Sequence, residues 1–496
     1  MAYFMGVDLG TSSAKALVVD GRGETVALAA EAYDIAIPRP GWAEQDVDGL
    51  WRACAACIRR ALGASGLASE AIAAVGLSGQ MHGLVALDGM LRPVRPAIIW
   101  ADRRSAAQVE HLRGLGAEDV ALNPAATGFL LPSLMWMREN EPERFGRVAH
   151  VLLPKDYVRL MLCGELGTDV TDASGTLAMD GARRDWSLPL LDALGLDAAL
   201  FPEVHLPSRV AGCVTARAAA DTGLRAGTPV VYGGGDGPMQ LVGNGVVRPG
   251  MLTANIGTAS QIDLITGSPL IDERHRMQLF CHAPEGRWIA MGASLNGGGT
   301  LKWLKNAFFD PQATYRDLDA LAASVPAGSA GLLALPYLCG ERSPHMDPCA
   351  RGTFSGFTLS HTRAHLVRAV MEGVVFALRD CLEVLEALSP QVSGDLIASG
   401  GGARSALWRQ MQADILKKRV FTTRSTEEAC LGAALTAAVG AGEFRDIDEA
   451  ASVVRMNPEV TEPNPRNFAL YDEHFAQFQQ LYRDNRALFS RMDAQG

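Results

Sequence analysis

A short segment near the middle of the chain, Val230 to Asn244, constrains the fold more than any other. It reads V-V-Y-G-G-G-D-G-P-M-Q-L-V-G-N, so a β-branched run passes into three glycines, one aspartate and a proline that can open a helix. This order predicts a strand, a tight loop and a helix, with Asp236 at the carboxyl end of the strand. Open α/β sheets place their chemistry at such strand ends. The alternative is that Asp236 only starts a helix and the glycines only form a turn.

The length of the chain indicates more than one domain. Its 496 residues exceed what a single hydrophobic core organises, and an α/β pattern precedes and follows the central segment. We therefore predict two α/β domains, residues 1–246 and 247–496. A final amphipathic helix at about 467–490 is expected to pack back on the body of the protein.

Composition excludes several classes of function. A formal net charge of −10 argues against a nucleic-acid partner, and the apolar runs are too short for a membrane span. The N-terminus lacks the basic region of a signal peptide. Nine scattered cysteines fit reduced thiols in a cytoplasmic protein, and Cys54 and Cys57 recur at helical spacing, which favours packing over metal or redox chemistry.

Two turns of similar composition open the two halves. The first contains Gly10, Thr11 and Ser12, and the second contains Gly257 and Thr258. Each could be an ordinary hairpin turn, but backbone N–H groups and hydroxyls in such a turn also suit an anion such as phosphate. Asp8 precedes the first turn and could hold Mg²⁺ through its water ligands.

Polar segments elsewhere supply further candidates. Gln80, Met81 and His82 are expected to be exposed in a turn between two strands, where His82 is either solvated or a ligand contact. Asp102 and Arg104, which follow Trp100, are either a solvated salt-bridged helix start or donors and acceptors for a polyol. The loop T-D-V-T-D-A-S-G-T at 168–176 is also of the kind that lines sites.

Glycine clusters in the second half could lie close to a ligand. Small residues let the backbone approach a flat ligand, and the helix N-terminus that follows favours an anion. These clusters are Gly298-Gly299 and Gly400-Gly401-Gly402-Ala403.

Taken in order, these motifs resemble the FGGY carbohydrate kinases and, among them, most closely the xylulokinases. The matching segments run from residue 5 to about 440 and are D-L-G-T-S-S-A-K, G-Q-M-H-G, W-A-D-R-R, L-L-P-K-D-Y, G-G-G-D, L-P-Y-L-C-G-E-R-S-P-H and G-G-G-A-R-S. The resemblance implies an actin-like, Hsp70-like architecture with a duplicated ribonuclease-H-like core and a cleft between the domains. It also implies that the first domain binds the sugar and the second the nucleotide.

The resemblance also implies roles for residues. Asp236 would be the catalytic base, and Asp8 the catalytic aspartate near Mg²⁺, with both carboxylates as candidate metal ligands. The sugar would contact Gln80, Met81, His82, Trp100, Asp102, Arg104 and Asp236. The nucleotide would contact Gly10, Thr11, Ser12, Lys15, Gly257, Thr258, Gly298, Gly299, Gly400, Gly401, Gly402 and Ala403.

The implied reaction is ATP-dependent phosphorylation of D-xylulose at O5. Departures from the family pattern at Ala101 and at Gly237-Pro238 keep another ketopentose, a polyol or glycerol open as substrates. An actin-like nucleoside triphosphatase without a sugar substrate is a further alternative, and a sugar-sensing pseudokinase would require loss of Asp8 or Asp236. The expected partners are therefore a small sugar and ATP with Mg²⁺, and a homodimer is an open possibility.

Overall fold

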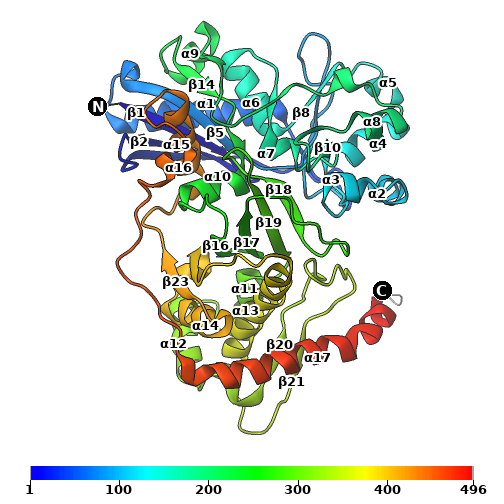
Figure 1. The fold of residues 1–496 in the computed structure, drawn as a ribbon, viewed down its shortest axis with the longest axis vertical. Coiled ribbons are helices and arrows are strands. Elements are labelled where there is room, and N and C mark those ends of the chain that lie inside the picture. Colours follow the sequence, from blue (N-terminus) through cyan, green and yellow to red (C-terminus); the bar gives the residue numbers. More distant parts are fainter. Residues whose placement is uncertain (1, 494–496) are drawn as a thin grey trace.

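The computed structural model describes residues 2–493, and its core consists of two mixed β-sheets, one from each half of the chain (Figure 1). The first sheet has seven strands. Six follow the order β13 (Val210–Cys213), β14 (Pro229–Val231), β5 (Ile72–Gly79), β1 (Tyr3–Leu9), β2 (Ser13–Asp20) and β3 (Thr25–Ala32). The seventh, β15 (Gly234–Gly235), pairs with the end of β5.

The second sheet repeats this plan. Its six strands follow the order β18 (Gln278–Cys281), β19 (Trp288–Ser294), β17 (Ser260–Thr266), β16 (Leu252–Ile256), β22 (Asp395–Ser399) and β23 (Arg419–Thr422). In each sheet the opening strand, β1 or β16, pairs antiparallel with the next strand along the chain and parallel with a later one on its other side. Both predicted Gly-Thr turns therefore join the first two strands of a sheet.

Helices cover both faces of the first sheet. α1 (Val47–Ser65) lies on β2 and β3 and carries Cys54 and Cys57 on its buried face, as the helical spacing predicted. α15 (Glu428–Gly440) lies on β1 and β5, although it belongs to the second half of the chain. In Figure 1 this helix stands beside β1 and β2. Because the chain crosses back here, the domain boundary at 246/247 stays a prediction.

The close approach of α15 depends on small residues. A Cβ atom on Gly6 of β1 would lie 1.9 Å from the carbonyl oxygen of Cys430, and one on Gly76 of β5 would lie 2.0 Å from that of Ala433. α10 (Asp236–Gly243) packs against the same helix, with Gly243 and Gly432 at their contact. The Ala/Gly composition of α15 allows this three-way contact.

The remaining helices form a lobe beside the first sheet and the cover of the second. The lobe, with its own apolar core, contains α2 (Ala106–Gly114), α3 (Ala117–Ala121), α4 (Leu130–Asn140), α5 (Pro142–Phe145) and α8 (Leu188–Ala193). α7 (Val170–Ala173) contacts β15 and buries Val170 and Ala173 in the core of the second half. α6 (Pro154–Cys163) and α9 (Ala216–Thr222) pack on α1. The second half contains α11 (Gly298–Phe308), α12 (Tyr315–Ala323), α13 (Arg363–Leu388), α14 (Ala406–Leu416), α16 (Ile447–Ala451) and α17 (Phe468–Asp493).

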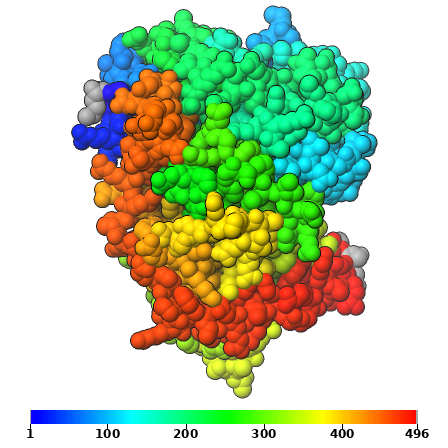
Figure 2. Space-filling view, viewed as in Figure 1, coloured from blue at the N-terminus to red at the C-terminus, as the bar shows by residue number. Residues whose placement is uncertain are grey.

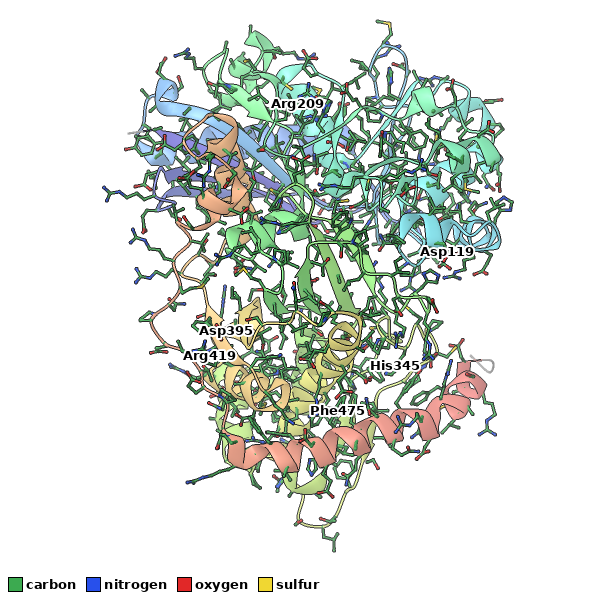
Figure 3. All side chains as sticks on the ribbon, viewed as in Figure 1. Asp119, Arg209, His345, Asp395, Arg419 and Phe475 are labelled. Carbon is green, nitrogen blue, oxygen red and sulfur yellow. The ribbon has the colours of Figure 1, made fainter. Side chains whose placement is uncertain are left out.

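The C-terminal helix α17 crosses the second half of the molecule (Figures 1 and 2). Phe475, labelled in Figure 3, and Phe478 bury their rings against Phe376 of α13. The helix thereby joins the main core of the second half. Within residues 2–493, no helix has both the length and the apolar character that a bilayer span requires.

Candidate active site

Asp236 lies where the sequence predicted, between a strand end and a helix. β15 pairs with Ser78 and Gly79 of β5, and α10 begins at Asp236 itself. The half-buried carboxylate accepts a hydrogen bond of 2.9 Å from the N–H of Gly237. Burial, reinforced by the charge of Asp8, raises the pKa of Asp236 to about 7. A carboxylate with this pKa can gain or lose a proton near neutral pH.

Asp8 ends β1 beside the first Gly-Thr turn. Its Oδ1 accepts a hydrogen bond of 2.7 Å from the hydroxyl of Ser78, which neighbours β15 across the sheet. Burial raises the pKa of Asp8, although the Ser78 hydrogen bond and the charge of Lys15 oppose this effect. Two neighbouring carboxylates with raised pKa values form a site that a cation would stabilise.

Side chains from four other segments surround the first turn. The Tyr33 hydroxyl donates to the carbonyl of Gly10, and Gln45 Nε2 donates over 2.7 Å to that of Thr11. Trp100 Nε1 donates over 2.9 Å to Thr11 Oγ1. Lys15 Nζ lies 2.6 Å from a carboxylate oxygen of Glu427, directly before α15. Ser12 is exposed at the tip of the turn.

The start of α11 holds the second turn. Gly298 N–H donates to the carbonyl of Gly257 over 2.7 Å, and Gly299 N–H donates to that of Thr258 over 3.0 Å. The structure thus brings together two sequence segments that were predicted separately. The Thr258 side chain is exposed. At the base of this turn, Asn255 Nδ2 donates over 3.2 Å to Gln240 of α10, so α10 connects the second turn with Asp236.

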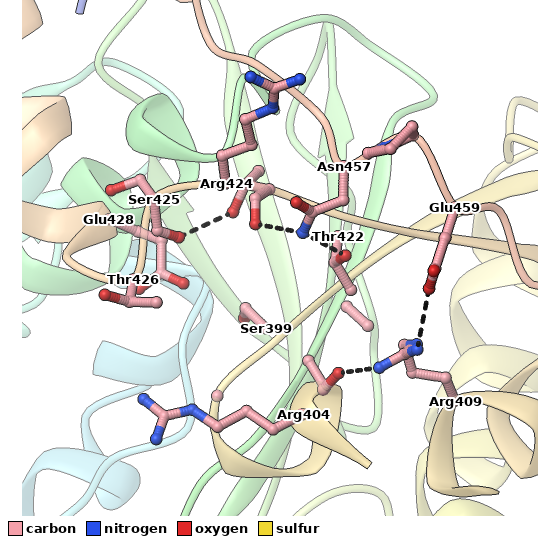
Figure 4. A pocket seen from close by; sticks show the side chains of 15 residues that line it. Ser399, Arg404, Arg409, Thr422, Arg424, Ser425, Thr426, Glu428, Asn457 and Glu459 are labelled. Atoms are coloured by element: carbon pink, nitrogen blue, oxygen red, sulfur yellow. Dashed lines mark hydrogen bonds and ion pairs between the residues drawn. The ribbon is translucent and has the colours of Figure 1, made fainter. Parts of the chain in front are cut away.

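A cavity of about 420 Å³ opens next to the glycine cluster Gly400-Gly401-Gly402-Ala403 (Figure 4). Gly400 and Ala403 line it, whereas Gly402 packs beneath the side chain of Ile256 and Gly401 is exposed outside it. Arg404 and Arg424 give the cavity positive charge. The other lining residues are Ala398, Ser399, Arg409, Thr422, Thr423, Ser425, Thr426, Glu428, Asn457, Pro458 and Glu459.

The predicted exposure of the Gln80–His82 turn is wrong, because Gln80 and Met81 are buried and His82 is half-buried. Gln80 is 1% exposed and Met81 is 6% exposed. Met81 packs in an apolar cluster with Phe280 and Met291, which come from the second half of the chain. The second sheet therefore covers a turn that the sequence of the first half alone leaves open.

His82 is held in a fixed orientation. Its backbone has a positive φ of 76°, its ring stacks on Phe129 at 4.0 Å between centroids, and its Nδ1 lies 2.7 Å from the carbonyl oxygen of Gly175. Burial lowers the pKa of His82 to about 4, so the ring is neutral at pH 7.

The structure also corrects the expectation for Asp102 and Arg104, because neither is solvated. Asp102 is 1% exposed and accepts from the N–H of Ala43 over 2.6 Å. Arg104 Nη2 lies 2.7 Å from both Asp102 and Glu44, and its guanidinium stacks 3.6 Å from the ring centroid of Trp42. These side chains are engaged in a buried network, whereas Trp100 is 44% exposed beside the first turn.

Sequence reasoning missed several residues that hold the site. Ser78, Gln45 and Glu427 contact Asp8, Thr11 and Lys15 respectively. Ser78 lies in the strand before the G-Q-M-H-G motif, so its position at a strand end was a usable signal. Gln45 and Glu427 carry no local signal, because their partners are distant in the sequence.

Comparisons with known proteins agree with this geometry. The FGGY N-terminal domain of carbohydrate kinases matches residues 3–243, and the C-terminal domain matches residues 252–441. A xylulose kinase from Staphylococcus epidermidis is 33% identical over 98% of this chain and 97% of its own, and one from Escherichia coli is 35% identical over 97% and 98%.

A solved structure gives the same result. The crystal structure of xylulose kinase from Rhodospirillum rubrum superposes with a TM-score of 0.91 at 32% identity, covering 98% of this chain and 100% of the other. The two-domain, actin-like fold expected from the sequence is confirmed. With both family domains and these relatives spanning nearly its whole length, the chain belongs to the FGGY family of carbohydrate kinases.

Proposed function

We propose that this protein is an ATP-dependent xylulose kinase that converts D-xylulose to D-xylulose 5-phosphate. The observation that carries the proposal is the position of Asp236, a half-buried carboxylate with a pKa raised to about 7 that α10 links to the second Gly-Thr turn. The choice of xylulose is supported by the relatives from Staphylococcus epidermidis and Escherichia coli, both named xylulose kinases.

The proposed chemistry requires one proton acceptor and stabilisation of negative charge. Asp236 accepts the proton of the sugar hydroxyl as oxygen bonds to the γ-phosphorus of ATP, and the bond to the bridging oxygen breaks so that ADP leaves with the electron pair. The N–H groups and hydroxyls of the two Gly-Thr turns would bind the phosphates. Lys15 adds a positive charge on the first turn.

The donor set also fits Mg²⁺. Asp8 and Asp236 present oxygen ligands, and the charge of Asp8 raises the pKa of Asp236, so a divalent cation between them would relieve their repulsion. When bound, Mg²⁺ would neutralise phosphate charge. The nucleoside is assigned to the cavity that Gly400, Ala403 and Arg404 line. The cytoplasmic location and a homodimer stay predictions.

Coupled ADP release with Mg-ATP tests the proposal. The sugar panel is D-xylulose, D-ribulose, L-ribulose, L-xylulose and glycerol, with a no-sugar control. We expect strong stimulation by D-xylulose alone. Stimulation by another sugar would contradict D-xylulose as the substrate and would point to Ala101 and Gly237 as the positions that change the specificity. ADP release that is independent of sugar would contradict the assignment as a sugar kinase.

The Asp236→Asn variant tests the base. Removal of a general base typically lowers kcat by about 10²–10⁴-fold, and ATP binding should be retained. Because Asp236 accepts a proton only when ionised, kcat of the unmodified enzyme should fall as the pH decreases through the pKa of Asp236, which burial and Asp8 raise and a bound Mg²⁺ would lower. Near-normal kcat in Asp236→Asn would contradict the assignment.

A further inference from the structure

A cluster of buried charges lies behind the loop that carries Asp236. It contains Lys155 and Asp156 of α6, Asp169 directly before α7 and Asp172 within α7, all with 0% side-chain exposure. Lys155 Nζ lies 2.7 Å from Asp156, 3.0 Å from Asp169 and 3.5 Å from Asp172. The function proposed above uses none of these groups.

Three of these residues resemble a metal site. Oxygen atoms of Asp156, Asp169 and Asp172 lie within 4.8 Å of one another, close enough to share a cation. The cation among them is the ammonium of Lys155. Burial lowers the pKa of Lys155, but the three carboxylates outweigh this effect and hold the pKa above its ordinary value, so the lysine stays charged.

The charges nearly balance. Arg159, also fully buried, adds a second cation 3.7 Å from Asp156, and burial raises the pKa of Asp172 well above its ordinary value. Two cations therefore face three carboxyl groups, and burial disfavours the charged form of one of them, Asp172. Such a cluster is stable as a whole, but removal of one partner leaves an uncompensated buried charge.

The cluster binds the backbone on both sides of the glycine run 233–235. Before it, Lys155 Nζ donates over 3.1 Å to the carbonyl of Tyr232. At its end, the N–H of Gly235 donates over 2.9 Å to Thr171 Oγ1, which in turn donates over 2.5 Å to Asp169. Glycines have no side chain with which to hold their own position, so these two contacts add to the pairing of β15 with β5 and fix the loop.

Space behind the loop is full. A Cβ atom on Gly235 would lie 2.6 Å from Met81 Cγ and 3.2 Å from Asp172 Oδ1. The cluster therefore contacts the residue immediately before Asp236. A shift of the cluster would move the start of α10, and with it the carboxylate of Asp236. Catalytic geometry tolerates little displacement of this kind.

We propose that Lys155 is a positioning residue for phosphoryl transfer, whose ammonium takes the place of a structural metal ion among three carboxylates and fixes the backbone from which Asp236 extends. This inference rests on the function proposed above. It assigns a role to the L-L-P-K-D-Y and T-D-V-T-D-A segments, which belong to one cluster.

The test is a double-mutant cycle on the full-length chain with Mg-ATP and the accepted sugar. Lys155→Met is expected to lower kcat by about 10–100-fold with the KM for ATP within about twofold, because both phosphate turns remain in place. Since Lys155 acts through Asp236, the double variant with Asp236→Asn should keep kcat within about threefold of Asp236→Asn alone. Independent, multiplying losses would overturn the proposal.

Thr171 offers a second variant pair if Lys155→Met fails to fold. Thr171→Val removes the acceptor for Gly235 N–H at nearly constant volume, and kcat should fall about tenfold. Thr171→Ser keeps the hydroxyl and should restore kcat. Unchanged kcat in Thr171→Val would contradict the proposal.

A matched control separates positioning from stability. Arg368 is a buried cation in the second half that pairs with Glu372 at 2.8 Å. Arg368→Met should lower the Tm as Lys155→Met does, yet leave kcat within about twofold. An unmodified enzyme without sugar-dependent ADP release would refute the proposed function itself, whereas an active enzyme with a fully active Lys155→Met variant would refute only this inference.

Discussion

The first Gly-Thr turn, between β1 and β2, and the second, between β16 and β17, differ in what holds them. Tyr33, Gln45 and Trp100 contact the first turn through their side chains, whereas two backbone N–H groups of α11 hold the second. Thr11 uses its hydroxyl within the protein, but the Thr258 side chain is exposed.

This difference indicates that the two copies of the Gly-Thr turn have separate roles in the proposed reaction. The first turn adjoins Asp8 and, through Ser78, the strand end that leads to Asp236, so its position is tied to the proposed chemistry. The second turn is held by backbone N–H groups at the start of the helix that follows Gly297, and its exposed Thr258 hydroxyl is available to a phosphate. We expect changes at the first turn to affect turnover and changes at the second to affect nucleotide binding.

The largest expected effect is on the free energy of unfolding and concerns the strands that follow the two turns, β2 and β17. The fourth residue of β2 is Ala16 and that of β17 is Asp263, and both are buried. Burial raises the pKa of Asp263 to about 7, and Asp263 Oδ1 has no hydrogen-bond partner within residues 2–493. The folded protein therefore binds a proton that the unfolded chain releases near its ordinary pKa of 3.8.

The stability from this proton is full below pH 3.8 and is lost as the pH rises to about 7. Asp263→Asn should therefore raise the free energy of unfolding by up to about 4 kcal/mol at pH 8 and by little at pH 4. Urea unfolding at both pH values measures this difference. An equal effect at the two pH values would contradict the expectation.

The next prediction tests whether the start of α11 holds the second Gly-Thr turn in place. A Cβ atom on Gly299 would lie 2.8 Å from the carbonyl oxygen of Thr258, so Gly299→Ala should displace the second turn. We expect the KM for ATP to rise about tenfold or more and the KM for the sugar to change less than about twofold. Gly394→Ala is the control, because open space surrounds that Cβ position. Equal changes in the KM for ATP and the KM for the sugar would contradict a specific role of the second turn in nucleotide binding.

A smaller effect concerns the side-chain support of the first turn. Trp100→Phe removes the hydrogen bond to Thr11, which contributes about 1 kcal/mol, so kcat/KM should fall about fivefold. Trp186→Phe, which removes a comparable bond of 2.7 Å to the carbonyl of Pro202, should leave kcat/KM unchanged. Steady-state kinetics of the two variants provide the measurement, and equal losses would mean that the Thr11 bond has no special role.

The smallest effect concerns the ion pair of Lys15 with Glu427, whose side chains are 37% and 22% exposed. Glu427→Gln should change the free energy of unfolding by less than about 1 kcal/mol. Because Lys15 is released, ATP affinity should increase about two- to threefold at low salt and lose this gain at high salt. Glu31→Gln, which breaks the exposed pair with Arg60, is the control. A weaker ATP affinity would contradict the expectation that Glu427 competes for Lys15.

Local patterns predicted the parts of the site that local chemistry defines. The strand, glycine run and helix around Asp236 were predicted correctly, because β-branched residues, glycine and proline act on their own backbone. The same holds for both Gly-Thr turns between strands and for the helix after Gly298. The roles of these residues in binding and catalysis stay predictions.

Burial and partners were predicted less well. Met81 was expected in the open, but the second sheet covers it, and a salt bridge of Asp102 was expected in solvent, but its pair with Arg104 is buried. α15 belongs to the second half of the chain, but it packs on the first sheet. In each case the contact comes from a segment whose position no local pattern gives.

Local sequence signals were sufficient for the Gly-Thr turns between strands and for the place of Asp236, since strand, turn and helix signals depend on neighbouring residues, whereas the duplicated core was implied by the family resemblance. Only the tertiary structure decided that Glu427 meets Lys15, that Lys155 lies among three carboxylates and that these groups support the glycine run. The physical reason is that the pairing of a buried charge depends on which distant segments exclude water from it.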